Sequence, residues 1–387
     1  MVEPTEHHLP HLAFLWPALA AASASDLAAS FAQQFVDFAV GAGNGRAPRE
    51  PQWTTPNTIA LELKTVRLRD FSTGQEATPV LLCAPFALHG ATVADFAAGH
   101  SLVAALRDSG LKRLFVTDWR SATADMRFLG VDDYLADLNV LVDQLGGHVD
   151  LVGLCQGGWM SLLYAARFPA KIRKLVLAGA PVDIAAAASG LSALVEASPF
   201  AVFQELVKLG DGRVFGHRVL KFWGPQMLES GDIHQLLQTS EPIESSAFTD
   251  LESKYREWYA WTVDLPGNYY LEVVDRLYKC NGLAACQFVA LGQTIDLAQV
   301  RVPIFLLAAR DDELVAPGQL FATEKLVGTL PENIGKAIAP CRHLGLFMGK
   351  MVLREHWTKI AHWIAEPELP KALSHNNAPV AESALKQ

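Results

Sequence analysis

Apolar runs alternate with segments of helical spacing along most of the chain. The run Pro79-Val-Leu-Leu-Cys-Ala84 is apolar throughout, as expected for a strand buried on both faces of a parallel sheet. Two alternating segments, at 59–63 and 66–71, predict strands before it. Repeated strand–helix alternation then predicts a doubly wound, mostly parallel sheet. The further predicted strands cover 114–117, 149–154 and 172–178, and the predicted helices cover 94–109, 131–145 and 157–168.

The strand pattern stops after Pro181 and returns at Val302–Ala309. The intervening residues are mostly of helical pattern and rich in aromatic side chains, which predicts a helical cap inserted over an active site. Each of these aromatic side chains can also serve only as core of the cap. The predicted organisation is an N-terminal helical segment and linker (1–57), a first part of the α/β core (58–182), the cap (183–290), a second part of the core (291–366) and a disordered tail (367–387).

The first residues predict an amphipathic helix. An apolar stretch at Leu12–Ala22 runs on through Phe31, Phe35 and Phe38. The stretch is too short to cross a bilayer, and no basic residue precedes Arg46, so neither a transmembrane segment nor a signal peptide is predicted. The helix is expected to pack on its own domain, with docking to a partner or an apolar surface as the alternative.

Composition narrows the class of protein. The chain has 387 residues, 50% of them hydrophobic, and a net charge of −9 without a Lys/Arg run, which argues against nucleic acid as a partner. Its five cysteines are odd in number and form no CxxC metal half-site, so a reduced, cytoplasmic protein without a metal or cofactor is predicted.

The sharpest motif is Gly153-Leu-Cys155-Gln-Gly157-Gly158, which lies between a predicted strand and a predicted helix. This is the G-x-nucleophile-x-G turn of α/β-hydrolases, with cysteine at the nucleophile position. Glycines are needed because side chains beside the strained turn would collide. The sequence therefore predicts an α/β-hydrolase fold with Cys155 as nucleophile. The alternative is a buried structural cysteine beside glycines that pack a helix.

The same turn predicts an oxyanion hole. The start of the helix favours a thiolate and a developing negative charge. One donor is the backbone N–H of Gln156, directly after the nucleophile. The second is expected from the loop after the strand at 79–84, at Phe86 or Ala87.

The remaining partners are predicted from their order along the chain. In this fold an acid follows a late strand, and a histidine follows the acid. Asp312 lies directly after the strand at 302–309, and His343 precedes the last predicted helix, at 351–365. Asp312 and His343 are thus the predicted acid and base. Asp311 is the rival acid, and His356 and His362 are rival bases.

These residues resemble polyhydroxyalkanoate (PHA) synthases, especially the short type whose catalytic subunit works with a second subunit. The family's box, [GS]-x-C-x-[GA]-G, matches Gly153 to Gly158, and the resemblance extends over about residues 75–365. Other matching segments are Val116-Thr-Asp-Trp119, Val131-Asp-Asp-Tyr-Leu135, Ala180-Pro-Val-Asp183, Leu277-Tyr-Lys-Cys-Asn-Gly-Leu283 and Leu291-Gly-Gln-Thr-Ile-Asp-Leu297.

The resemblance implies polymerisation of 3-hydroxyacyl-CoA with release of CoA. Cys155 would carry the acyl group, His343 would deprotonate it, and Asp312 would activate the substrate hydroxyl or orient His343. CoA would enter as a thioester substrate and not as a cofactor. The implied partners are the hydroxyacyl-CoA or the polyester, a homodimer mate or second synthase subunit, and the surface of a polyester granule.

Three positions differ from the family's pattern. Glu313 stands where the family has histidine, Cys341-Arg342 stands where it has Gly-Gly, and Arg120 follows Trp119 where it tends to have glycine. Arg342 could bind a CoA phosphate or be an ordinary surface charge. An intracellular polyester depolymerase or a thioesterase with the same triad is therefore the alternative function. A non-catalytic, granule-associated protein is the second alternative.

Overall fold

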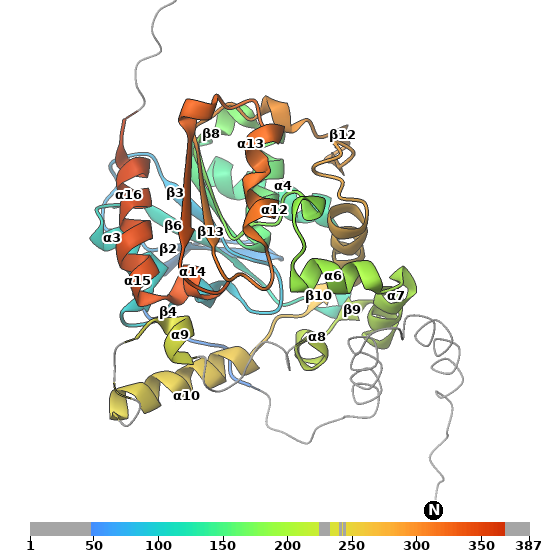
Figure 1. Ribbon diagram of the computed structural model, residues 1–387, viewed down its shortest axis with the longest axis horizontal. Coiled ribbons are helices and arrows are strands. Elements are labelled where there is room, and N and C mark those ends of the chain that lie inside the picture. Colours follow the sequence, from blue (N-terminus) through green and yellow to red (C-terminus); the bar gives the residue numbers. More distant parts are fainter. Residues whose placement is uncertain (1–47, 224–232, 240–241, 243–244, 368–387) are drawn as a thin grey trace, which may run out of the picture.

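The computed structural model describes residues 48–223, 233–239, 242 and 245–367. Its centre is an eight-stranded sheet within these residues, shown in Figure 1. Strands β1 and β2 are antiparallel to each other, β2 is antiparallel to β6, and the other neighbours are parallel. The predicted doubly wound, mostly parallel sheet is thus confirmed. The strand order is β1 (Thr58–Glu62), β2 (Val66–Asp70), β6 (Leu114–Trp119), β3 (Val80–Cys83), β7 (Val149–Leu154), β8 (Ile172–Ala178), β13 (Ile304–Ala309) and β14 (Ile334–Ala339).

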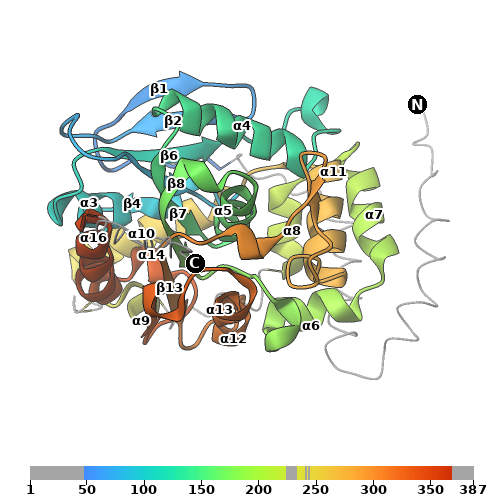
Figure 2. The same cartoon turned by 90° about the horizontal axis from the view of Figure 1, so that it is seen from above.

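Helices cover both faces of this sheet, as Figures 1 and 2 show. Their apolar positions recur at helical spacing; in α4, Val131, Tyr134, Leu135 and Leu138 are all buried. Because both faces are covered, the central strands β3 and β7 have no exposed residue. One face carries α4 (Val131–Gln144), α5 (Gln156–Arg167), α12 (Pro317–Phe321) and α13 (Thr323–Leu326); the other carries α3 (Leu102–Asp108), α14 (Gly345–Met348), α15 (Lys350–Val352), a π-helix at Leu353–Trp357 and α16 (Thr358–Ala365).

Between β8 and β13 the chain leaves the sheet and forms a group of helices at one end of it (Figure 1). A π-helix at Val273–Lys279 continues α11 directly. The domain boundaries at residues 57, 182 and 290 stay predictions. The elements are α6 (Gly190–Ala197), α7 (Phe200–Leu209), α8 (Gly216–Trp223), α9 (Ile233–Leu237), α10 (Ser246–Ala260), α11 (Gly267–Glu272) and the short strands β9 (Arg213–Val214), β10 (Leu265–Pro266), β11 (Val289–Ala290) and β12 (Gln293–Thr294).

Two details differ from the predicted elements. The helix predicted over 94–109 begins only at Leu102, because β4 (Asp95–Ala97) and β5 (His100–Ser101) form a hairpin before it. Strand β14 was not predicted. The predicted N-terminal helix and most of the predicted tail lie outside the described residues. Among those that are described, no helix combines the length and apolarity that a membrane span requires.

Candidate active site

Cys155 lies on a strained turn between β7 and α5. Its φ is +50° and its ψ is −119°, a backbone conformation that residues with side chains rarely adopt. The neighbouring glycines allow the turn. A Cβ on Gly157 would lie 2.1 Å from the carbonyl oxygen of Cys83 in β3, and one on Gly153 would lie 2.5 Å from the Cα of Gly158. In this turn, backbone atoms are therefore in such close contact that only glycine fits at these two positions.

We predict that Gly157→Ala destabilises the fold by about 1–3 kcal/mol, because the new methyl group must push β3 and α5 apart. Gly74→Ala is the matched control, since a Cβ there meets only a lysine side chain at 3.6 Å. Urea denaturation of both variants measures the difference. Equal stability of Gly157→Ala and the wild type would contradict this account of the turn.

Asp312 and His343 form a buried pair on the loops after β13 and β14. Nδ1 of His343 lies 3.0 Å and 2.8 Å from the two carboxylate oxygens of Asp312, and the side chains are 2% and 0% exposed. Oδ1 of Asp312 also accepts hydrogen bonds from the backbone N–H groups of Leu314 and Val315, at 2.9 Å and 2.8 Å. The carboxylate is therefore held in place by its own loop and in turn holds the imidazole.

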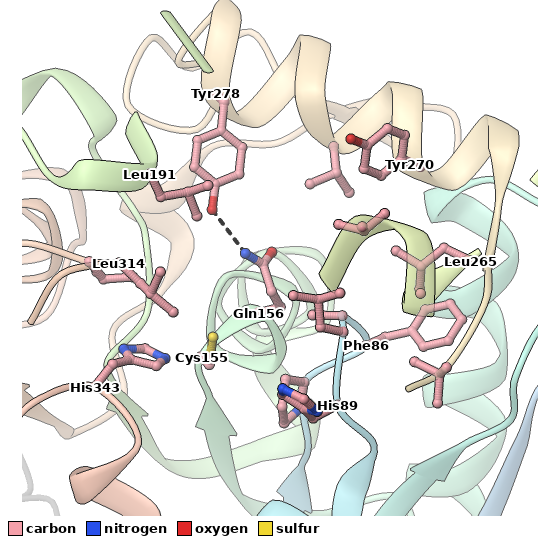
Figure 3. Close-up of a pocket in the computed structure, with 18 of the residues that line it drawn as sticks. Phe86, His89, Cys155, Gln156, Leu191, Leu265, Tyr270, Tyr278, Leu314 and His343 are labelled. Carbon is pink, nitrogen blue, oxygen red and sulfur yellow. Dashed lines mark hydrogen bonds between the residues drawn. The ribbon is translucent and has the colours of Figure 1, made fainter. Parts of the chain in front are cut away.

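The other ring nitrogen of His343 faces the cysteine. Nε2 is buried, and Figure 3 shows the ring beside the sulfur of Cys155. Burial lowers the pKa of His343, but the charges of Asp312 and of Cys155 outweigh it and raise the pKa well above its ordinary value. The geometry and charge fit an imidazolium that pairs with a thiolate.

The residues predicted to supply the oxyanion donors line the same cavity as Cys155. Gln156 is the first residue of α5, so its backbone N–H has no partner within the helix. Phe86 and Ala87 line the same cavity as Cys155. The Gln156 side chain accepts a hydrogen bond from Trp159 Nε1 at 2.7 Å and donates one to the Tyr278 hydroxyl at 2.9 Å. Its amide therefore links the turn to the helical segment above it (Figure 3).

The Cys155 side chain lines a largely apolar cavity of about 300 Å³. Its walls come from the turn, from the loop after β3, from α6 and from α11 with the following π-helix. Glu313 also lies in the wall, and its carboxylate is 3.5 Å from Nε of Arg342. An apolar cavity with a few polar groups at one end is typical of a site for a small or chain-like organic substrate.

The rival residues lie elsewhere. Asp311 is exposed, and His356 and His362 are on the last helical segment, away from the cavity walls. The structure thus brings together Cys155 and His343 with Asp312, and it leaves out the three rivals. In the part of the chain that is described, no group of three or more His, Cys, Asp or Glu side chains is arranged to hold a metal ion.

Comparison with known proteins places this chain in a family. A family model of the alpha/beta hydrolase fold matches residues 94–350. The chain belongs to the alpha/beta hydrolase fold family.

Several relatives of this α/β-hydrolase share most of their length with it. It is 28% identical to the poly(3-hydroxyalkanoate) polymerase subunit PhaC of Synechocystis sp., over 81% of this chain and 85% of that protein. It is 26% identical to the PhaC subunit of Allochromatium vinosum, over 75% of this chain and 82% of that protein. The solved monoacylglycerol lipase of Paleococcus ferrophilus matches with a TM-score of 0.49 and 16% identity, over 77% of this chain and 98% of that one.

The predicted resemblance to PHA synthases is confirmed by these similarities, and the chain is an enzyme of the acyltransferase or hydrolase class. One polar residue of the site, His89, was not predicted from the sequence; it lines the cavity beyond the predicted oxyanion loop. Its only signal in the sequence is its place five residues after the predicted strand at 79–84, and that is too weak to single out one of twelve histidines.

Proposed function

We propose that this protein transfers 3-hydroxyacyl groups from CoA to the hydroxyl end of a growing polyester, with Cys155 as the acyl carrier. The observation that carries the proposal is the position of the Cys155 thiol, on the strained turn, beside His343 and at the end of an apolar cavity. Similarity to the PhaC polymerase subunits over most of the chain supports the choice of substrate.

The first half-reaction loads the cysteine. His343 holds the proton of the Cys155 thiol, and the thiolate attacks the carbonyl carbon of the acyl-CoA thioester. The oxyanion that forms is stabilised by the N–H of Gln156 and by an N–H of the loop at Phe86 and Ala87. The bond to the CoA sulfur breaks, and CoA leaves with the proton from His343. The product is an acyl group on Cys155, joined by a new thioester.

The second half-reaction lengthens the polyester. The hydroxyl oxygen of a bound hydroxyacyl chain attacks the carbonyl of the acyl-Cys155 thioester, and Nε2 of His343 takes the hydroxyl proton. An ester bond forms, the carbon–sulfur bond breaks, and the Cys155 thiolate beside a protonated His343 is restored. Apolar walls favour this outcome because they exclude water, the competing acceptor.

Asp312 acts through His343 in this proposal. Its side chain is 0% exposed and all its hydrogen bonds run to His343 and to its own loop, so it has no path to a substrate hydroxyl. Of the two roles that the family resemblance implied, this geometry favours orientation of the imidazole. Hydrolysis of the same polyester or thioester needs only a change of acceptor from hydroxyl to water, and it is the second candidate.

A direct assay separates the candidates. We expect purified protein and 3-hydroxybutyryl-CoA to release CoA, to show one hydroxybutyryl adduct on Cys155 by intact-protein mass, and to form polyester. CoA is measured with a thiol reagent added after quenching, so that Cys155 is not blocked. Release of CoA with free hydroxy acid and no polymer would overturn the synthase proposal in favour of a hydrolase. Absence of both CoA release and an adduct would contradict acyl transfer from CoA altogether.

A further inference from the structure

His89 is a polar residue of the cavity wall that the proposed mechanism does not use. It lies on the loop after β3, and its ring packs against Trp258 at 4.4 Å and Tyr259 at 4.9 Å between ring centroids. The next residue, Gly90, is packed so closely on Trp261 that a Cβ would lie 2.7 Å from the indole. The imidazole is therefore fixed in one orientation by its surroundings.

The hydrogen bond of one ring nitrogen determines what the other can do. Nδ1 of His89 lies 3.2 Å from the carbonyl oxygen of Trp261, which can only accept, so Nδ1 carries the proton. Burial lowers the pKa of His89 to about 4, with the hydrogen bond to Trp261 partly opposing it, so the ring is neutral at neutral pH. In that tautomer Nε2 presents a lone pair and is an acceptor.

This acceptor has no donor in the protein. Nε2 of His89 is buried and has no hydrogen-bond partner among the described residues. A buried polar atom without a partner lowers stability, and a ligand in the cavity that supplies a donor would remove this cost. The ligand group must carry an O–H or N–H, which excludes the carbonyl oxygens of a thioester or an ester.

We propose that Nε2 of His89 accepts a hydrogen bond from the hydroxyl group of the bound hydroxyacyl unit, and that His89 thereby selects hydroxyacyl over plain acyl substrates. The proposal rests on the proposed function, because it concerns the same cavity and the same acyl group. His89 and Cys155 line one cavity, and Figure 3 places both in its walls. A plain acyl chain would leave the buried lone pair unsatisfied, and sites built around a hydroxyl discriminate against analogues that lack it.

The test compares two thioesters that differ only in this hydroxyl, 3-hydroxybutyryl-CoA and butyryl-CoA. Because both carry the same CoA, the ratio of their single-turnover rates of Cys155 acylation isolates the acyl hydroxyl. We expect the wild type to prefer 3-hydroxybutyryl-CoA, and His89→Phe to reduce this preference by about tenfold, the order of one lost hydrogen bond. The butyryl-CoA rate should stay close to that of the wild type, because the phenyl ring keeps the packing on Trp258 and Tyr259.

Three further variants keep the test decisive. His89→Gln, whose amide oxygen can accept, should recover part of the preference. His89→Leu replaces His89→Phe if the larger ring prevents folding, which the melting temperature reports. Tyr164→Phe is the control, because it removes a hydroxyl that hydrogen-bonds to Asn139 outside the cavity walls, and it should leave the preference intact.

The outcomes distinguish failure of this inference from failure of the proposed function. A wild type that is acylated by neither thioester would overturn the proposed function and this inference with it. A wild type that reacts with 3-hydroxybutyryl-CoA, together with an unchanged preference in His89→Phe, would overturn the role of His89 alone. Equal slowing of both substrates would do the same, since it would assign His89 to binding of CoA or to packing.

Discussion

Cys155→Ala is expected to abolish CoA release from 3-hydroxybutyryl-CoA, with a loss of about 10⁴-fold or more. The reason is that the thiol is the only group of the turn that can form the acyl intermediate, so its removal deletes both half-reactions. Alanine fits the turn without adding bulk, and the melting temperature should stay near that of the wild type. The measurement is single-turnover CoA release together with intact-protein mass, in which the hydroxybutyryl adduct should vanish.

Two further variants define what this loss means. Cys280→Ser removes a thiol from the exposed end of the π-helix at 273–279, and it should retain full activity and the adduct. Cys155→Ser should retain little activity, because a serine hydroxyl is far less ionised than a thiol beside the same histidine. Full activity of Cys155→Ala would contradict nucleophilic catalysis by Cys155 and assign the CoA release to another group of the protein.

The central strands could be predicted because burial on both faces leaves a continuous apolar run in the sequence. Strands β3 and β13 are such runs, and β7 departs from the pattern at the buried Asp150. The bounds of all three strands agree with the predicted segments within about two residues. The turn at Cys155 was predictable for a different reason. Backbone contacts as close as that of Gly157 to Cys83 require glycine at fixed positions, so the local sequence records the tertiary contact.

The parts that could not be predicted depend on distant partners. Strand β14 is at the edge of the sheet, where its residues are only partly buried and include Lys336, so no apolar pattern marks it. The helix predicted over 94–109 fails because the Asp95 carboxylate is buried in hydrogen bonds to Thr55 and Ser101, which fix a hairpin there. Tertiary hydrogen bonds here override a helical spacing of apolar residues.

The residues of the candidate site also divide into those that the sequence could predict and those that it could not. Chain order placed Asp312 and His343 as candidates, because the fold fixes which loops meet above the nucleophile. The spacing Asp312-Glu-Leu-Val-Ala-Pro317 favoured Asp312 over Asp311, and the structure gives the physical reason, since one carboxylate is buried against His343 and the other is exposed. His89 had no such rule behind it, since its partners come from a segment more than 160 residues away in the chain.

Asp312→Asn should reduce the rate of Cys155 acylation by about 10²- to 10⁴-fold while the fold is retained. A loss of rate is expected because hydrogen bonds from the loop fix how the asparagine amide is oriented. The N–H groups of Leu314 and Val315 both donate to Oδ1, so they will hold the amide oxygen of the asparagine at that position. The amide nitrogen then takes the place of Oδ2, 2.8 Å from Nδ1 of His343. Because it donates, it forces Nδ1 to accept and moves the ring proton to Nε2, which can no longer take the proton of Cys155.

The same substitution should change the state of the cysteine before any substrate binds. In the wild type burial lowers the pKa of His343, but the charges of Asp312 and Cys155 outweigh it and raise the pKa, which favours the imidazolium. Without the Asp312 charge the pKa of His343 falls, and the imidazolium is less favoured. Alkylation of Cys155 by iodoacetamide at pH 7 should therefore be slower in Asp312→Asn than in the wild type.

Peptide mass spectrometry of the alkylated protein provides the control within each sample. Cys280 and Cys286 are exposed and distant from this loop in the chain, so their alkylation should follow the same pH profile in both proteins. A change confined to Cys155 would assign Asp312 to the protonation of His343, because a loss of folding would expose Cys83 and Cys341 as well. An unchanged Cys155 profile, with acylation still lost, would instead place Asp312 in direct contact with the substrate and contradict the orientation that its buried hydrogen bonds favour.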